Sequence, residues 1–265
     1  MKGFNKMEWI RIILKGVMWI FIIGFGCNFI MQTISYSFYK GAKPMRDISC
    51  QPIKLQMNDQ LTGYGYNMDS KSDHLIIFFG GSNYTAYNSV GKFGAYYDCP
   101  FISVDYYGTQ ESKGKMNLKS MKQTALEAYT WITKAYPNRQ ITVMGHSYGC
   151  GMAAYLASER TCNNLILVAA YRDLSDLYNK IIPIFWGPAK VFISNNIQIS
   201  AYAKNTACKT YIIGSLNDKT LDTNLQHKVC HCYENATLQI FKDITHEDYL
   251  TNEQVIDYIR CLCTK

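Results

Sequence analysis

Short apolar runs recur along most of the chain, separated by segments with a helix-like spacing. The runs are rich in β-branched and aromatic residues, as the buried strands of a parallel sheet are. They occupy residues 74–79, 100–105, 140–144, 164–170, 209–214 and 238–241. Between and after them, residues 118–135, 150–158 and 252–263 favour helices. This alternation predicts an α/β fold with a mostly parallel sheet that helices cover on both faces.

A hairpin precedes these strands. Residues 53–57 and 61–66 are strand-like, and the turn residues Asn58 and Asp59 lie between them. Two strands joined by so short a turn must be antiparallel. The hairpin is therefore expected to form an antiparallel edge of the sheet.

The start of the chain has another pattern. From Gly16 to Tyr39 there is no charged residue, and residues 17–31 are almost wholly apolar. A membrane-spanning helix needs about 20 such residues, so the run is long enough to cross a bilayer. Asn28 and Gln32 make its far end only weakly hydrophobic.

Basic residues precede this run, as they do in signal peptides and signal anchors. No Ala-x-Ala cleavage site follows it, which favours an uncleaved signal anchor over a cleaved signal peptide. Cys27 leaves a lipoprotein-like cleavage site as a third alternative. We divide the chain into a signal anchor with linker, residues 1–45, and one α/β domain, residues 46–265.

Composition and charge narrow the class of protein. A chain of 265 residues that is 48% hydrophobic can bury the core of one such domain. The net charge is +7, but no Lys/Arg block alternates with aromatic residues, which argues against a nucleic-acid surface. No metal-ligand spacing and no phosphate loop occur, so neither a metal nor a cofactor is expected. The sequence does not indicate an oligomeric state.

Residues 145–149, Gly-His-Ser-Tyr-Gly, carry the most specific chemical signal. A strand-like run precedes them and a helix-favouring run rich in Ala and Leu follows. Strand, G-x-S-x-G and helix together form a nucleophile elbow, whose sharp turn lifts the serine hydroxyl clear of the sheet. Ser147 is therefore the candidate nucleophile.

A serine hydroxyl needs a base within hydrogen-bond reach. Of the five histidines, only His246 follows the last strand at the upper edge of the sheet, where the base belongs. We expect the side chain of His146 to point away from the serine. The acid that orients the base is expected to be Asp218, after the strand at 209–214, with Asp173 after the preceding strand as the alternative.

A developing negative charge needs backbone N–H donors. The elbow offers the N–H of Tyr148, and the turn after residues 74–79 offers a second, expected from Gly81 because glycine lets the backbone approach closely. Residues 171–208 contain an apolar centre that could line an acyl pocket, touch a bilayer or pack on the sheet. They are too few for a separate cap domain.

From about residue 50 onward the chain resembles the α/β-hydrolase superfamily. The resemblance rests on the Gly80-Gly81-Ser82-Asn83 turn, the Asp105-Tyr-Tyr-Gly108 turn, the elbow, the turn holding Asp218 and the segment holding His246. More narrowly, the chain is similar to small, lidless, single-pass hydrolases that include depalmitoylases and monoacylglycerol or lysophospholipid lipases. It departs from them at Phe79, often a histidine in the family, and at His146 and Tyr148, commonly Arg and Leu.

The resemblance implies a membrane-anchored serine hydrolase that cleaves an ester, thioester or amide of a small-molecule or acylated substrate. A peptidase or amidase of the same fold is the nearest alternative. A non-catalytic scaffold that binds a partner is an alternative of a different class.

The basic residues beside the apolar run and the number of cysteines both bear on which side of the membrane the domain lies. Basic residues flank the apolar run on both sides, so the positive-inside rule gives only a slight preference for a domain outside the cytoplasm. Ten cysteines without zinc spacing add to that preference. We expect at least one disulfide between the pair Cys230/Cys232 and the pair Cys261/Cys263, with buried thiols as the equal alternative.

Overall fold

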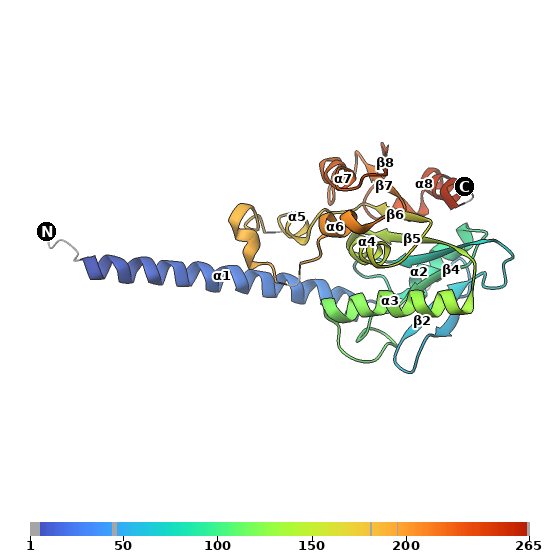
Figure 1. The fold of residues 1–265 in the computed structure, drawn as a ribbon, viewed down its shortest axis with the longest axis horizontal. Helices are drawn as coiled ribbons and strands as arrows, with labels where there is room; N and C mark the ends of the chain where they lie inside the picture. The colour runs from blue at the N-terminus through green and yellow to red at the C-terminus, as the bar shows by residue number, and fades with distance from the viewer. Residues whose placement is uncertain (1–5, 44–46, 181, 195, 264–265) are drawn as a thin grey trace.

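A computed structural model describes residues 6–43, 47–180, 182–194 and 196–263 (Figure 1). In this part of the chain, eight strands form one sheet in the order β1-β2-β4-β3-β5-β6-β7-β8. The strands are β1 (Ile53–Gln56), β2 (Thr62–Tyr66), β3 (His74–Phe79), β4 (Phe101–Val104), β5 (Gln140–His146), β6 (Asn164–Val168), β7 (Lys209–Ser215) and β8 (Ala236–Phe241). The pairs β1–β2 and β2–β4 are antiparallel and the others are parallel. The predicted hairpin edge and parallel sheet are confirmed.

Two cores lie on opposite faces of the sheet, because successive strand residues point to opposite sides. In β3, Ile76 and Phe78 join one core, and Leu75, Ile77 and Phe79 join the other. Helices α2 (Ala86–Phe93) and α8 (Glu253–Cys263) cover the first core. Helices α3 (Leu118–Ala135), α4 (Cys150–Glu159) and α7 (Thr223–Cys230) cover the second. Short 3-10 turns complete the domain: η1 (Gly94–Tyr96), η2 (Ser147–Gly149) and η5 (Tyr249–Thr251).

The amino-terminal helix α1 (Lys6–Gly41) projects from one side of the domain (Figure 1). It is the one helix among the described residues that is long and apolar enough to cross a membrane. Large apolar side chains are exposed from Trp9 to Ile30. A core helix of a soluble protein would bury them.

The carboxyl-terminal half of α1 packs on the domain. Met31, Ser35 and Tyr39 are buried, and the Tyr39 hydroxyl donates to the Gly80 carbonyl oxygen at 2.9 Å. Asn28 donates through Nδ2 to Ser194 Oγ at 2.8 Å. These contacts explain why the far end of the apolar run contains polar residues.

The described residues between β6 and β7 form short helices rather than a cap. They are α5 (Leu174–Tyr178), η3 (Gly187–Phe192), α6 (Ile199–Tyr202) and η4 (Ala203–Asn205). Phe185 is buried, whereas Trp186 is exposed. The apolar centre of residues 171–208, at 181–186, thus packs into the core at Phe185 and faces outward at Trp186. Ile181 lies outside the described residues.

The expected disulfide between the two cysteine pairs is not formed, and that expectation was wrong. Cys230 and Cys232 pack against the core under α3, α4 and α7, whereas Cys263 belongs to the core under α2 and α8. The sheet separates the two pairs. A different pair lies in contact: Cys162 donates through its Sγ to the Sγ of Cys208 at 3.0 Å.

We expect Cys162 and Cys208 to form a disulfide by exchange with a disulfide donor such as oxidised glutathione. The Cys162 hydrogen bond lowers the pKa of the Cys208 thiol, which favours the thiolate that attacks. The cross-link should raise the free energy of unfolding by about 2–4 kcal/mol. Peptide mass mapping without reductant, with denaturation in the presence and absence of reductant, measures both effects.

Cys208→Ser should abolish the linked peptide and the gain in stability, and Cys230→Ser should change neither. Two alkylatable thiols at 162 and 208 after oxidation would contradict the prediction.

Candidate active site

The turn at the end of β5 holds Ser147 in a strained position. Its backbone φ is +52°, a left-handed conformation that a non-glycine residue adopts only when its surroundings enforce it. A side chain on Gly149 would overlap the carbonyl oxygen of Phe79, and one on Gly145 would lie 2.7 Å from Cys150 Cα. The two glycines therefore let α4 and β3 close tightly around the serine.

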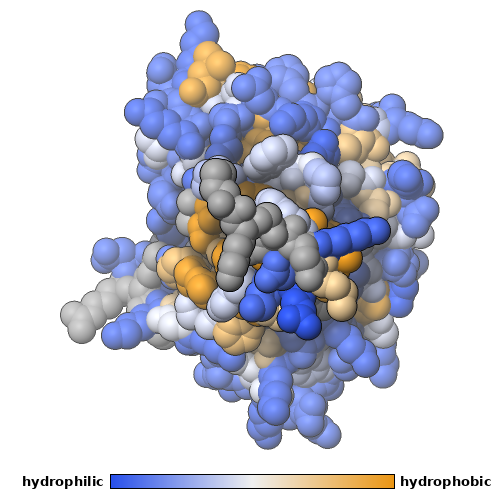
Figure 2. Space-filling model, turned by 90° about the vertical axis from the view of Figure 1, so that its left-hand side faces the viewer, coloured by the Kyte–Doolittle hydropathy of each residue, from blue (hydrophilic) through white to orange (hydrophobic). Residues whose placement is uncertain are grey.

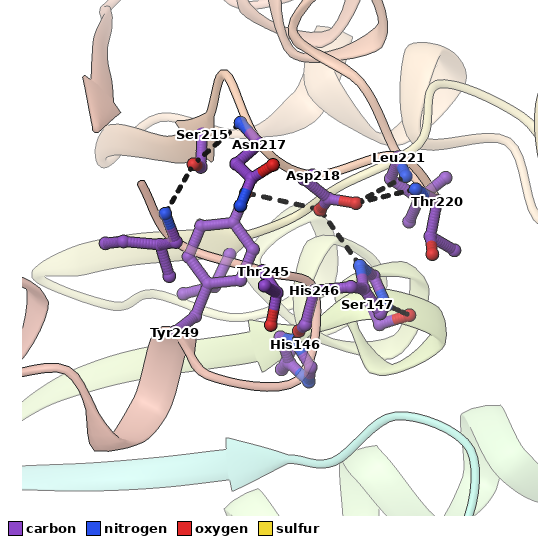
Figure 3. Close-up of polar contacts among 12 residues, drawn as sticks. His146, Ser147, Ser215, Asn217, Asp218, Thr220, Leu221, Thr245, His246 and Tyr249 are labelled. Atoms are coloured by element: carbon purple, nitrogen blue, oxygen red, sulfur yellow. Dashed lines mark hydrogen bonds and ion pairs between the residues drawn. The ribbon is translucent and has the colours of Figure 1, made fainter. Parts of the chain in front are cut away.

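Three side chains from separate loops meet in one hydrogen-bonded row (Figure 3). His246 Nε2 lies 3.0 Å from Ser147 Oγ, and His246 Nδ1 lies 2.9 Å from Asp218 Oδ2. His246 follows β8 and Asp218 follows β7, so both loops lie at the carboxyl edge of the sheet, where β5 ends. The structure thus brings together the nucleophile, base and acid expected from the sequence.

The Asp218 carboxylate is held by several donors. The backbone N–H groups of Thr220 and Leu221 donate to Oδ1 at 2.8 and 2.9 Å, and the Tyr249 hydroxyl donates to Oδ2 at 3.2 Å. Burial alone would raise the pKa of Asp218, but His246 and the two N–H groups outweigh it, so the pKa lies below its ordinary value. The ionised carboxylate fixes the Nδ1–H tautomer of His246, which leaves the Nε2 lone pair facing the serine.

The alternative acid, Asp173, is engaged elsewhere. The Ser200 hydroxyl donates to its Oδ1 at 2.6 Å, and Arg172 Nε lies 3.3 Å from its Oδ2. Asp105 accepts the N–H of Ala86 through its Oδ1 at 2.8 Å, at the start of α2. Neither side chain contacts His246.

The turn after β3 lies against the nucleophile. A Cβ built on Gly81 would stand 3.0 Å from Ser147 Cβ, closer than an ordinary contact, so the glycine lets the two backbones lie close together. Tyr148 follows the serine with its ring buried, and its carbonyl oxygen accepts from the Tyr171 hydroxyl at 3.1 Å. The backbones of both expected donors thus lie next to Ser147.

His146 does not point away from the site, contrary to expectation. Its ring lies 5.3 Å from the His246 ring, and its Nε2 lies 3.2 Å from the His246 carbonyl oxygen. Burial, followed by repulsion from His246, lowers the pKa of His146 to about 3. The neutral ring therefore donates through Nε2–H and keeps Nδ1 as an acceptor. That Nδ1 is buried and has no partner in the described part of the chain.

Sequence reasoning missed two supporting side chains. Tyr249 lies three positions after His246, and nothing in the motif indicated its bond to Asp218. His146 was visible beside the serine, but strand alternation alone placed its side chain on the far face. Of the other histidines, His74 begins β3, His227 lies on α7 and His231 follows α7.

The row opens into a cavity of about 510 Å³ with two unlike sides. Its apolar side comes from α1, α5 and the elbow, and its polar side from Lys92 of α2 and from the loops after β3, β7 and β8. The apolar side includes Met31, Ile34, Phe38, Tyr148, Leu177 and Tyr178. The polar side includes Asn83, Lys92, Thr220, Glu247, Asp248 and Thr251. A substrate with an apolar arm and a polar arm on either side of its reacting carbonyl fits this shape. Within the described residues, no cluster of His, Cys, Asp or Glu could hold a metal ion.

Comparison with known proteins identifies the fold. A sequence model of the α/β hydrolase fold matches residues 78–192. The chain has the α/β hydrolase fold. No curated protein matches its sequence.

Several solved α/β-hydrolases have a similar structure. An esterase from Pyrococcus furiosus superposes with a TM-score of 0.62 at 16% identity, over 84% of this chain and 98% of that one. A lipase-esterase related protein from Clostridium acetobutylicum gives 0.59 at 17% identity, over 76% of this chain and 99% of that one. An acylaminoacyl peptidase from Pyrococcus horikoshii gives 0.54 at 15% identity, over 82% of this chain but 40% of that one. At these identities the likeness establishes the fold.

We expect Ser147→Ala and His246→Ala each to lower kcat by several orders of magnitude without unfolding the protein. Because the three groups act as a unit, the double variant should be little worse than either single one. Asp218→Asn should also lower kcat severely, by about three to four orders of magnitude, because it upsets the tautomer. Steady-state kinetics on a p-nitrophenyl ester, with circular dichroism for the fold, measures this.

Asp173→Asn is the matched control and should retain kcat. A larger loss in Asp173→Asn than in Asp218→Asn would place the acid on the earlier loop.

We also expect His146→Ala to lower kcat about ten- to a hundredfold while KM changes little. Removing the donor leaves the buried His246 carbonyl unsatisfied, which costs about 1–3 kcal/mol and loosens the loop that holds the base. His74→Ala, which removes a partly buried histidine at the start of β3, is the control and should leave kcat unchanged. Equal kcat in the two variants would show that His146 does not position the base.

Proposed function

We propose that the protein is a membrane-anchored serine hydrolase that cleaves esters or thioesters of acyl chains through an acyl-enzyme. One observation carries the proposal: Ser147, His246 and Asp218 form an unbroken hydrogen-bonded row, with distances of 3.0 and 2.9 Å, that opens into a cavity. A serine hydroxyl facing the free lone pair of a histidine that a carboxylate orients is the arrangement nucleophilic catalysis requires.

The reaction follows from these positions. Ser147 Oγ attacks the substrate carbonyl carbon while its proton passes to His246 Nε2. The carbonyl oxygen becomes an oxyanion, which the N–H groups of Gly81 and Tyr148 stabilise. When the tetrahedral intermediate collapses, the bond to the leaving group breaks and His246 returns the proton to that group.

Hydrolysis of the acyl-enzyme repeats these steps with water. His246 takes a proton from the water molecule that attacks the acyl carbon, and then gives it to Ser147 Oγ as the acid leaves. Asp218 stays ionised and stabilises the imidazolium in both halves.

The two-sided cavity supports an acyl substrate. An acyl chain would lie along Met31, Phe38 and Leu177, and the leaving group would face the polar loops. Helix α1 would anchor the protein and, together with residues 42–45, precede the catalytic domain at 46–265. We further propose that this domain lies outside the cytoplasm.

A peptidase or amidase is the second candidate, favoured by the polar side of the cavity, where Glu247 and Asp248 could bind a peptide amine. The similarity to an acylaminoacyl peptidase covers only 40% of that chain. The apolar wall contributed by α1 favours the acyl ester.

A fluorophosphonate probe should label the wild-type protein at Ser147 and should not label Ser147→Ala. On p-nitrophenyl esters, kcat/KM should rise with chain length from acetyl to about octanoyl. Burying each added CH₂ contributes about 0.8 kcal/mol of favourable binding free energy. Aminoacyl p-nitroanilides are the comparison.

Labelling with higher kcat/KM on the anilides would make the protein a peptidase. Absence of both labelling and turnover would leave only a binding scaffold. Protease protection in sealed vesicles tests the topology.

A further inference from the structure

A turn of the domain lies along α1 well outside the sheet (Figure 1, yellow-orange segment beside the blue helix). The Phe192 ring packs edge-on against Phe21 and Phe25, with ring centroids 5.5 and 5.4 Å apart. A Cβ on Gly24 would lie 2.5 Å from the same ring. Two residues on, the Ser194 carbonyl oxygen accepts from Gln32. Residues 192–194 are thus joined to α1 from Phe21 to Gln32.

If α1 spans a bilayer, these contacts place the turn beside the part of α1 that lies in the membrane. The hydrocarbon core is about 30 Å thick and a helix rises about 1.5 Å per residue, so about 20 residues are needed. Before Phe21, α1 contains only Lys6–Ile20, and that stretch includes Glu8, Arg11 and Lys15. A span that ended before the turn would be too short and too charged. The span must therefore overlap the residues that Phe192 contacts.

The exposed surface of the turn suits lipid. Trp186 and Val191 are 68% and 67% exposed, although both are large and apolar. Phe29, on the neighbouring helix, is 71% exposed. Lysines outnumber carboxylates in the hollow beside Trp186, which is lined by Lys180, Lys190, Lys228, Asp176 and Asp222. Tryptophan with adjacent lysines is the composition of a membrane–water interface. Seen along α1, hydrophobic residues gather around the helix while the rim of the domain is hydrophilic (Figure 2).

We propose that residues 186–192 are a second membrane contact, inserted beside α1 at the lipid interface. The proposal rests on the membrane anchor of the proposed function. It has a consequence for the substrate, because the cavity wall facing this side is made by Met31 and Ile34 of α1 and by Leu177 and Tyr178 of α5. The acyl chain of a membrane lipid then reaches Ser147 between these two helices without leaving the apolar phase.

Tryptophan fluorescence in vesicles tests the contact, since the chain has four tryptophans at separate sites. Full-length variants that keep only one of Trp19, Trp131 or Trp186, with the others replaced by Phe, are reconstituted into phosphatidylcholine vesicles. The acyl chains of these lipids are brominated near the headgroup. We expect bromine to quench Trp186 and Trp19 and to leave Trp131, on α3, unquenched.

Quenching of Trp19 without Trp186 would overturn the second contact and leave the anchor intact. Absence of quenching at Trp19 as well would overturn the anchor itself. Labelling of each variant by the fluorophosphonate probe shows independently whether the hydrolase site is folded and active.

The functional arm uses Trp186→Ser/Val191→Ser in the same vesicles. Relative to wild type, kcat/KM should fall at least about tenfold on a long-chain lipid ester in the bilayer, because two apolar side chains no longer insert. Hydrolysis of water-soluble p-nitrophenyl acetate should be unchanged. Ile53→Ser, which removes an exposed apolar residue on β1 at the far edge of the sheet, should affect neither substrate. An equal loss on both substrates, or none on the lipid, would overturn the proposal.

Discussion

The close packing of the 145–149 turn on the end of β3 is the constraint on which the site depends. Gly149 lies so near the Phe79 and Gly80 carbonyls that any side chain there would overlap them. This approach holds Ser147 at a positive φ and places Gly81 beside it. The strain is stabilised by β5 and β3, which are buried on both faces and paired along their length. Without that packing, neither the nucleophile nor the neighbouring N–H groups would be fixed.

The charge states of Asp218 and His146 are set by their surroundings. Asp218 is buried, yet three donors besides His246 surround it, so its pKa lies below the ordinary value although burial alone would raise it. For His146, burial and the neighbouring His246 prevail and lower the pKa, so its ring stays neutral. A neutral neighbour supports the His246 loop without competing for the proton. The two histidines are therefore suited to different tasks by their surroundings rather than by their chemistry.

The strands were predictable because each is marked by a local apolar run. The row of three side chains was predictable from the order of its residues along the chain. Apolar runs gave β3 and β7 nearly to the residue, and the order of Ser147, Asp218 and His246 along parallel strands placed them at one edge. Helix α2 was missed because it is short and depends on the Thr85 cap, which accepts the Asn88 N–H at 2.9 Å. The predictions of the cysteine pairing and of the His146 orientation were wrong for another reason. Both depend on which face of the sheet a side chain occupies, and the pattern at strand ends does not specify it.

Helix α1 could be recognised from the sequence as a candidate membrane span, but not as a wall of the cavity. Its polar residues Asn28 and Gln32 weaken the apolar run, and the structure shows why they are there: both bond to Ser194. Farther along, Tyr39 donates to Gly80, directly before the glycine that touches the nucleophile. A buried hydrogen bond of this kind contributes about 1 kcal/mol. Helix α1 and the turn that holds Gly81 are thus joined by a buried hydrogen bond. Cutting the chain at residue 45 would remove one side of the cavity and expose Tyr148, so the helix that is long and apolar enough to cross a membrane also shapes the cavity.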